Sequence, residues 1–281
     1  MGELIGYSFF TNALIGVLII SVATAIVGTY VMARRMASIT GGVTHACFGG
    51  LGLGYYLGVS PIMMAGVFAI GSSLAVEWLS ARHKVREDSA IAVVWSLGMA
   101  LGVLFVFLTP GFVPELNAFL FGNILNISHT DLWIFALYTA LLVGLFAWKS
   151  REIVACAFDR DFARVQGLPV KAITLVMTVM TALCIVLAIR LVGIMMLMAV
   201  ISLPQMSAEV FTRRFNRVMW LSALISVAGG VCGLIVSAYV DVPCSALIVL
   251  VLGAVYVLCR VAGAVRFALA GRRSGEKGEE P

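Results

Sequence analysis

One histidine stands in a stretch of the chain that otherwise holds mostly glycine and small apolar residues. The stretch ITGGVTHACFGGLGLGYYLG covers residues 39–58, and His45 is its only side chain with an ordinary pKa near neutrality. A membrane helix accepts glycine because neighbouring helices can pack closely, but a histidine in hydrocarbon requires a partner, a water-filled cavity or a ligand. His45 is therefore a candidate metal ligand. The alternative is that its imidazole only hydrogen-bonds a carbonyl of a neighbouring helix.

A glutamate in the second half of the chain is another candidate ligand. Glu209 lies in SLPQMSAEVF, shortly after Pro204, which leaves one backbone carbonyl without its helical donor and free to face a cavity. Such a position suits a second ligand near the exit of an ion pathway. The alternative is an ion pair between Glu209 and Arg213, one helical turn further along.

The composition places the chain in the membrane. Of its 281 residues, 62% are apolar and 12% are charged, and the mean hydropathy of +1.07 lies far above that of soluble proteins. Several apolar runs exceed about 18 residues, enough to cross a hydrocarbon core about 30 Å thick, and the alternating pattern of a membrane β-barrel is absent. We predict an all-α integral membrane protein, a polytopic helical bundle surrounded by membrane lipid. Its basic clusters indicate membrane topology and not nucleic-acid binding.

Nine apolar segments are predicted to span the membrane. They cover residues 10–32, 41–58, 61–80, 89–108, 131–149, 172–190, 193–211, 217–239 and 243–260. The basic residues cluster at 34–35, 82–86, 149–171 and 213–217, and in the tail from 260. All these clusters share one side if the N-terminus lies outside and the C-terminus lies in the cytoplasm, as the positive-inside rule requires.

One membrane domain is predicted to account for nearly the whole chain. It covers residues 1–265, and the charged residues 266–281 are predicted to form a disordered cytoplasmic tail. The long connection at 109–130 is half apolar, which predicts a short helix lying at the membrane interface.

The longest basic connection contains a predicted short helix. In KSREIVACAFDRDFARVQGLPVKA, Asp159 can cap a helix over 161–165 that Gly167 and Pro169 bring to an end. Phe158 and Phe162 then form an apolar ridge flanked by charges, which suits a groove on a soluble partner. The alternative is an amphipathic helix that rests on lipid headgroups.

Six segments of the chain resemble one family in order and spacing. They are ARRMASITGGVTHACFGGLGLGYYLG, REDSAIAVVWS, FLFGNIL, FDRDFARVQGLP, IRLVGIMMLMAVISLPQMSA and YVDVPCSALIVLVLGAVY. Together they span about residues 10 to 260 and resemble the permease subunits of bacterial ABC importers for zinc, manganese and iron. The resemblance implies a protein of the bacterial cytoplasmic membrane that works as a homodimer, with a cytoplasmic ATP-binding subunit and an extracytoplasmic metal-binding protein.

The resemblance also assigns the cytoplasmic connection to coupling. It implies that residues of the loop at about 150–171 contact the ATP-binding subunit, namely Phe158, Asp159, Asp161, Phe162, Arg164, Gly167 and Pro169. No GxxxxGK followed by Ser or Thr occurs in the chain, so ATP hydrolysis belongs to a separate subunit. We therefore expect a non-catalytic subunit that binds no cofactor of its own.

Two other classes of protein fit the sequence less well. A self-sufficient secondary metal transporter or channel would require several acidic side chains within the membrane for ion coupling, and the chain offers few. An intramembrane zinc protease would require HExxH or a similar cluster, and none is present.

The chain departs from the family at the predicted metal site. Family members usually place an aspartate four residues before the histidine, and here that position is Gly41. Without that carboxylate, Thr44, Cys47 or water would complete the ligation by His45. By ligand softness this tips the balance away from manganese and towards zinc or iron. The expected cargo is zinc, with manganese or iron next. The consecutive apolar run MMLM at 195–198 is predicted to pack and not to ligate.

Overall fold

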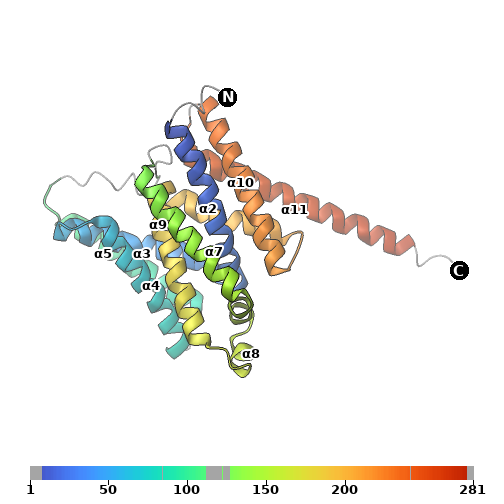
Figure 1. The fold of residues 1–281 in the computed structure, drawn as a ribbon, viewed down its shortest axis with the longest axis horizontal. Coiled ribbons are helices and arrows are strands. Elements are labelled where there is room, and N and C mark those ends of the chain that lie inside the picture. Colours follow the sequence, from blue (N-terminus) through green and yellow to red (C-terminus); the bar gives the residue numbers. More distant parts are fainter. Residues whose placement is uncertain (1–7, 84, 112–121, 123–126, 241, 277–281) are drawn as a thin grey trace.

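The computed structural model describes residues 8–83, 85–111, 122, 127–240 and 242–276, and the regular structure in these residues is helical. The helices are α2 (Ser8–Ala33), α3 (Ser38–Leu57), α4 (Pro61–His83), α5 (Glu87–Leu108), α7 (His129–Phe158), α8 (Arg160–Val165), α9 (Val170–Glu209), α10 (Phe215–Val240) and α11 (Cys244–Glu276). Figure 1 shows the long helices as a bundle, with the short α8 at one end. The prediction of an all-α membrane bundle is confirmed.

Seven of the described helices are long and apolar enough to cross a membrane, namely α2, α4, α5, α7, α9, α10 and α11. α3 is not among them, although the sequence predicted a span over 41–58. Its glycines and His45 contribute little apolar surface. α3 is instead placed by its neighbours, since it packs against α4 and α5.

The helix α9 contains a reversal of the chain. Thr181 and Gln205 would be about 36 Å apart in a straight helix, at 1.5 Å per residue. Both nevertheless reach the same part of α2: Gln205 donates a hydrogen bond to the carbonyl of Thr24, and Thr181 lines a small cavity with Tyr30. The turn lies at Gly193, whose φ of 77° is in the region that favours glycine. α9 thus contains the two spans that the sequence predicted over 172–190 and 193–211.

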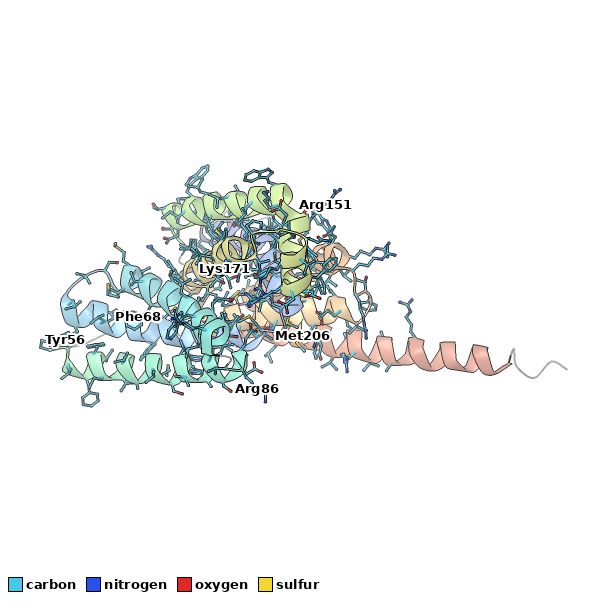
Figure 2. The ribbon with its side chains drawn as sticks, turned by 90° about the horizontal axis from the view of Figure 1, so that it is seen from below. Tyr56, Phe68, Arg86, Arg151, Lys171 and Met206 are labelled. Atoms are coloured by element: carbon cyan, nitrogen blue, oxygen red, sulfur yellow. The ribbon has the colours of Figure 1, made fainter. Side chains whose placement is uncertain are left out.

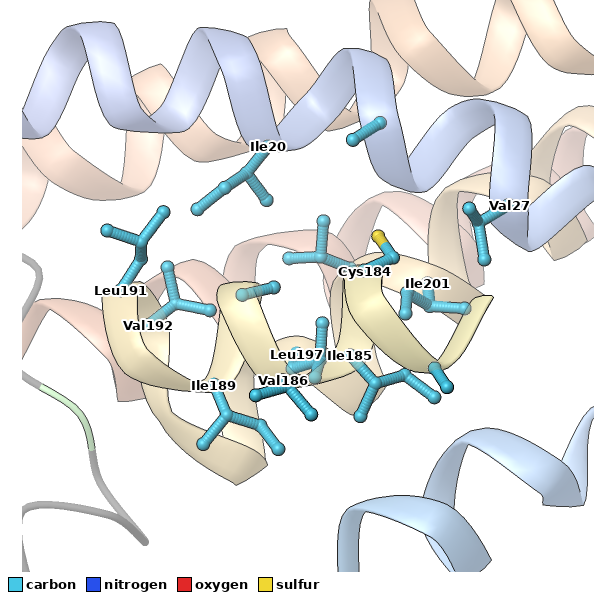
Figure 3. Close-up of a cluster of buried hydrophobic side chains, with 14 of the residues drawn as sticks. Ile20, Val27, Cys184, Ile185, Val186, Ile189, Leu191, Val192, Leu197 and Ile201 are labelled. Atoms are coloured by element: carbon cyan, nitrogen blue, oxygen red, sulfur yellow. The ribbon is translucent and has the colours of Figure 1, made fainter. Parts of the chain in front are cut away.

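The buried core is centred on α2 and on both arms of α9. Figure 3 shows Ile20 and Val27 of α2 in one cluster with Ile185 of the first arm and Leu197 of the second. These side chains are buried, and helices that are apolar on all sides are typical of the centre of a membrane bundle.

The helices α3, α4 and α5 form a tightly packed group on one side of this core (Figure 2). Glycines permit the close approach. A Cβ atom built on Gly52 would lie 2.5 Å from the carbonyl oxygen of Gly102 in α5, so the two backbones touch at this point. Close glycine contacts of this kind are typical of helix pairs in membranes, because they maximise van der Waals contact.

The helix α11 extends away from the bundle at the C-terminal end of the chain (Figures 1 and 2). It continues to Glu276, beyond residue 265, where the sequence predicted that the membrane domain ends. Residues 277–281 lie outside the described part, and the disordered tail over 266–281 stays a prediction. The predicted interfacial helix over 109–130 also falls mostly outside it.

Candidate functional site

His45 projects from α3 toward α5. Its imidazole stacks on the indole of Trp95, with 4.6 Å between the ring centroids and 3° between the ring planes. The histidine is half-buried, and the stacking leaves its ring nitrogens at the edge of the pair. A neutral imidazole held in this way can offer one nitrogen to a transition metal. Trp95 was not predicted, because nothing in the sequence indicates which residue of α5 faces position 45.

Thr44 and Cys47 lie on another face of α3. Cys47 is about 200° around the helix from His45, and both Thr44 and Cys47 are fully buried. The hydroxyl of Thr44 donates to the carbonyl of Thr40 in its own helix. The structure therefore does not bring these two predicted ligands together with His45 on one helix face.

The space one turn before His45 is filled by a methionine. A Cβ atom built on Gly41 would lie 2.9 Å from the Cε of Met198, which reaches across from the second arm of α9, and 4.0 Å from the ring of Trp95. A side chain at position 41 could enter this space only if the flexible end of Met198 moved. Met198 belongs to the run that the sequence assigned to packing, and it packs here.

Within the described residues, no group of three or more His, Cys, Asp and Glu side chains is arranged to hold a metal ion. Within this part of the chain, few possible protein ligands lie near His45.

Glu209 lines a cavity of about 840 Å³ at the end of the bundle that carries α8. Four arginines line the same cavity, namely Arg34, Arg35, Arg213 and Arg260. Their positive charges outnumber the single carboxylate, so the potential in the cavity disfavours a cation. Arg213, which was the alternative ion-pair partner of Glu209, lines the same cavity and acts on the carboxylate electrostatically, but no ion pair within 4 Å joins these two described residues.

The segment predicted for coupling forms the expected capped helix. Asp159 accepts hydrogen bonds from the backbone amides of Asp161 and Phe162, at 3.0 and 2.9 Å, and so caps α8. Arg164 pairs with Asp161 one turn earlier, at 3.0 Å. After α8 the chain turns at Gly167, with a φ of 77°, and Pro169 caps α9.

Three large apolar side chains are exposed on and beside α8. Phe158, Phe162 and Val165 are 60%, 56% and 88% exposed, whereas Ala163 is fully buried. Phe158 also makes an edge-on contact with Phe215 of α10, at 6.3 Å between ring centroids. The apolar surface available for docking is thus formed by Phe162 and Val165 together with part of Phe158. Val165 was not among the predicted coupling residues.

An ion cluster beside α8 was also missed by the sequence analysis. The guanidinium of Arg160 lies 3.1 Å from Glu77 of α4 and 3.6 Å from Glu87 of α5. Arg34, which follows α2, lies 3.0 Å from Glu77 and 3.4 Å from Glu87. The four residues are far apart in the sequence, and no short motif connects them.

The comparison with protein families is decisive for the class of this protein. A family model described as the ABC 3 transport family matches residues 6–262. The chain belongs to the ABC 3 transport family. As a member of this family it is a membrane permease subunit and not a catalytic one, so the resemblance drawn from the sequence motifs is confirmed.

Relatives of this ABC 3 permease span nearly its whole length. An uncharacterised membrane protein of Synechocystis sp. is 33% identical over 92% of each chain. The manganese transport system membrane protein MntC of Halalkalibacterium halodurans is 29% identical over 91% of this chain and 88% of its own. A probable iron transport system membrane protein of Haemophilus influenzae is 29% identical over 94% of this chain and 97% of its own.

A solved structure has the same fold as the permease. A chain of PsaBC from Streptococcus pneumoniae in complex with Fab superposes with a TM-score of 0.79 and 24% identity, over 92% of this chain and 94% of that one. The agreement extends over most of both chains and shows a common fold. The permease is thus a multi-pass protein of the inner membrane.

Proposed function

We propose that two copies of this permease form the membrane pathway of an importer for divalent transition metal ions, with zinc as the preferred ion and manganese or iron next. His45 is the observation that carries the metal assignment. It is a half-buried imidazole in a glycine-rich helix of the bundle, and its ring stacks on Trp95. The manganese and iron names of the relatives support a transition metal as cargo.

The preference for zinc rests on the donors around His45. Position 41 offers no carboxylate, and the neighbouring space holds the thioether of Met198. A site with imidazole nitrogen and little oxygen suits zinc better than manganese, which prefers oxygen ligands. Two copies of the chain, each contributing one histidine, would form such a site between them.

The ATP-binding subunit is proposed to dock on α8. Phe162 and Val165 project into solvent at the end of the bundle, beside a charged and capped turn. An exposed apolar ridge on a short helix suits a groove on a soluble partner. The extracytoplasmic metal-binding protein would then dock at the opposite end, in agreement with a cytoplasmic C-terminus.

The metal assignment can be tested in liposomes that contain the permease with its ATP-binding subunit and its metal-binding protein. Uptake of radioactive zinc, manganese and iron is measured with and without ATP. We expect ATP-dependent uptake in the order zinc, then manganese or iron. His45→Ala should reduce uptake by a factor of about 100, as expected when an essential ligand is lost.

The matched control is His83→Ala, which removes the histidine at the end of α4. It should leave uptake unchanged. Full uptake by His45→Ala would remove His45 from the pathway. Metal flux by the permease alone, without ATP, would favour a secondary transporter or channel.

The docking assignment has its own test. Phe162→Asp places a charge in the exposed ridge and should abolish copurification of the ATP-binding subunit. The capping contacts of Asp159 use its side chain and the backbone amide of Phe162, so α8 should persist in the variant. Normal copurification with Phe162→Asp would contradict docking at α8.

A further inference from the structure

The helix α8 is attached to the rest of the permease by two different kinds of contact. On one side, Ala163 packs with Cys156 of α7 and Val170 of α9 in a small apolar cluster. On the other side, Arg160 reaches α4 and α5 through ion pairs with Glu77 and Glu87. The apolar packing joins α8 to α7 and α9, which are its neighbours along the chain, whereas the ion pairs join α8 to α4 and α5.

The ion cluster contains one fixed cation and one accessible cation. The side chain of Arg34 is 5% exposed and that of Arg160 is 31% exposed. Burial works to lower the pKa of Arg34, but Tyr30, Glu77 and Glu87 outweigh it and the pKa lies above its ordinary value. Arg34 therefore stays charged and holds both carboxylates together. Arg160 can leave and return, because Glu77 and Glu87 keep a cationic partner while water solvates its guanidinium.

The carboxylate partner on α5 lies at the start of the helix that touches His45. Glu87 is the first residue of α5, and Trp95 lies eight residues further, about 12 Å along the helix. Trp95 stacks on His45, and the backbones of α3 and α5 meet at Gly52 and Gly102. A shift of α5 at Glu87 would therefore move the surface against which His45 packs.

We propose that Arg160 is a positioning residue that transmits movement of α8 to α4 and α5, and through Trp95 to His45. The proposal rests on the proposed function, in which the ATP-binding subunit moves α8. It assigns to Arg160 a role different from that of the exposed ridge. The exposed ridge binds the ATP-binding subunit, whereas Arg160 passes the resulting movement of α8 to α4 and α5.

The test uses the complete transporter in liposomes, with the ATP-binding subunit and the metal-binding protein present. Three quantities are measured: copurification of the ATP-binding subunit, the basal rate of ATP hydrolysis, and the number of zinc ions transported per ATP hydrolysed. Arg160→Gln should leave the first two quantities unchanged and reduce the third about tenfold. Arg160→Lys keeps the charge and should restore most of the ratio.

Two further variants separate transmission from simple stability. Lys149→Gln is the matched control, because it breaks an ion pair with Glu152 inside one helix, at 2.6 Å, and should not change the ratio. Glu87→Gln removes the partner on α5 and should lower the ratio as Arg160→Gln does. The loss in the double variant should be smaller than the sum of the two single losses, since both substitutions remove the pair between Arg160 and Glu87.

The outcomes are distinct from those of the proposed function. An unchanged ratio in Arg160→Gln would overturn the proposal, and so would additive effects of Arg160→Gln and Glu87→Gln. Loss of copurification in Arg160→Gln would also overturn it, because Arg160 would then belong to the docking surface. If the proposed function itself is wrong, the unmodified transporter will move no metal, or Phe162→Asp will still bind the ATP-binding subunit.

Discussion

The contact between α3 and α5 and the contact between α8 and α5 are formed by different kinds of chemical group. α3 meets α5 through glycines, backbone against backbone, with the stacked rings of His45 and Trp95 beside them. α8 meets α5 through the charged side chain of Arg160, across 3.6 Å to Glu87. At Gly52 the first contact joins backbone to backbone, whereas the second contact joins two long side chains.

This difference separates a part that must keep its shape from a part that can move. A close glycine contact depends on shape at short range, so it is lost when the helices separate even slightly. An ion pair between long and partly exposed side chains tolerates movement, because water can replace either partner. We infer that α3, α4 and α5 move as one unit, and that Arg160 passes movement of α8 to this unit while its long side chain tolerates small shifts.

The largest expected effect is on the glycine contact. Gly52→Ala should destabilise the permease by about 3 kcal/mol, because the new Cβ would meet the backbone of Gly102 and overpacking of a rigid contact is costly. The measurement is thermal unfolding of the purified protein in detergent. Gly71→Ala is the matched control: a Cβ there has no atom within 4 Å, so it should be neutral or slightly stabilising. Equal stability of the two variants would show that the helix backbones can move apart.

An intermediate effect is expected at the buried cation of the ion cluster. Arg34→Met should cost about 2 kcal/mol, because Glu77 and Glu87 would then share only Arg160 and both carboxylates are partly exposed. The neighbouring Arg35 is exposed, so Arg35→Met is a control for loss of positive charge at this end. Thermal unfolding should separate the two variants, and identical curves would argue that the cluster contributes nothing to stability.

The smallest effect is expected at the exposed ion pair within α8. Arg164 and Asp161 have side chains that are 65% and 90% exposed, and they pair only across one turn. Arg164→Gln should therefore change the free energy of unfolding by less than about 0.5 kcal/mol. A larger loss in thermal unfolding would mean that α8 depends on its own charges, and it would weaken the contrast with Arg160.

Local features of this permease were predictable from short stretches of sequence. Asp159, Gly167 and Pro169 act on the backbone within a few residues, so the capped helix α8 could be predicted before its surroundings were known. The two apolar runs on either side of Gly193 predicted two spans, and α9 contains both. His45 stood out because a histidine among glycines in a membrane segment requires an explanation.

Features that depend on which helices face each other were not predictable in this way. Glu77 pairs with Arg34 and Arg160, which lie 43 and 83 residues away in the sequence. Trp95 stacks on His45 from α5, and Met198 reaches Gly41 from α9. Thr44 and Cys47 were close to His45 in sequence but lie on a different face of the helix, because successive residues are rotated by about 100°.

By itself, the sequence determined that this chain is a helical membrane protein, where its apolar helices run, and where α8 begins and ends. Hydrophobicity and helix capping act over one helix or less, so they can be evaluated from neighbouring residues alone. Only the tertiary structure decided that Met198 fills the space beside Gly41 and that Arg160 connects α8 to α5. The reason is that pairing between helices depends on the rotation and depth of each helix, and many weak contacts distributed over the whole bundle set both.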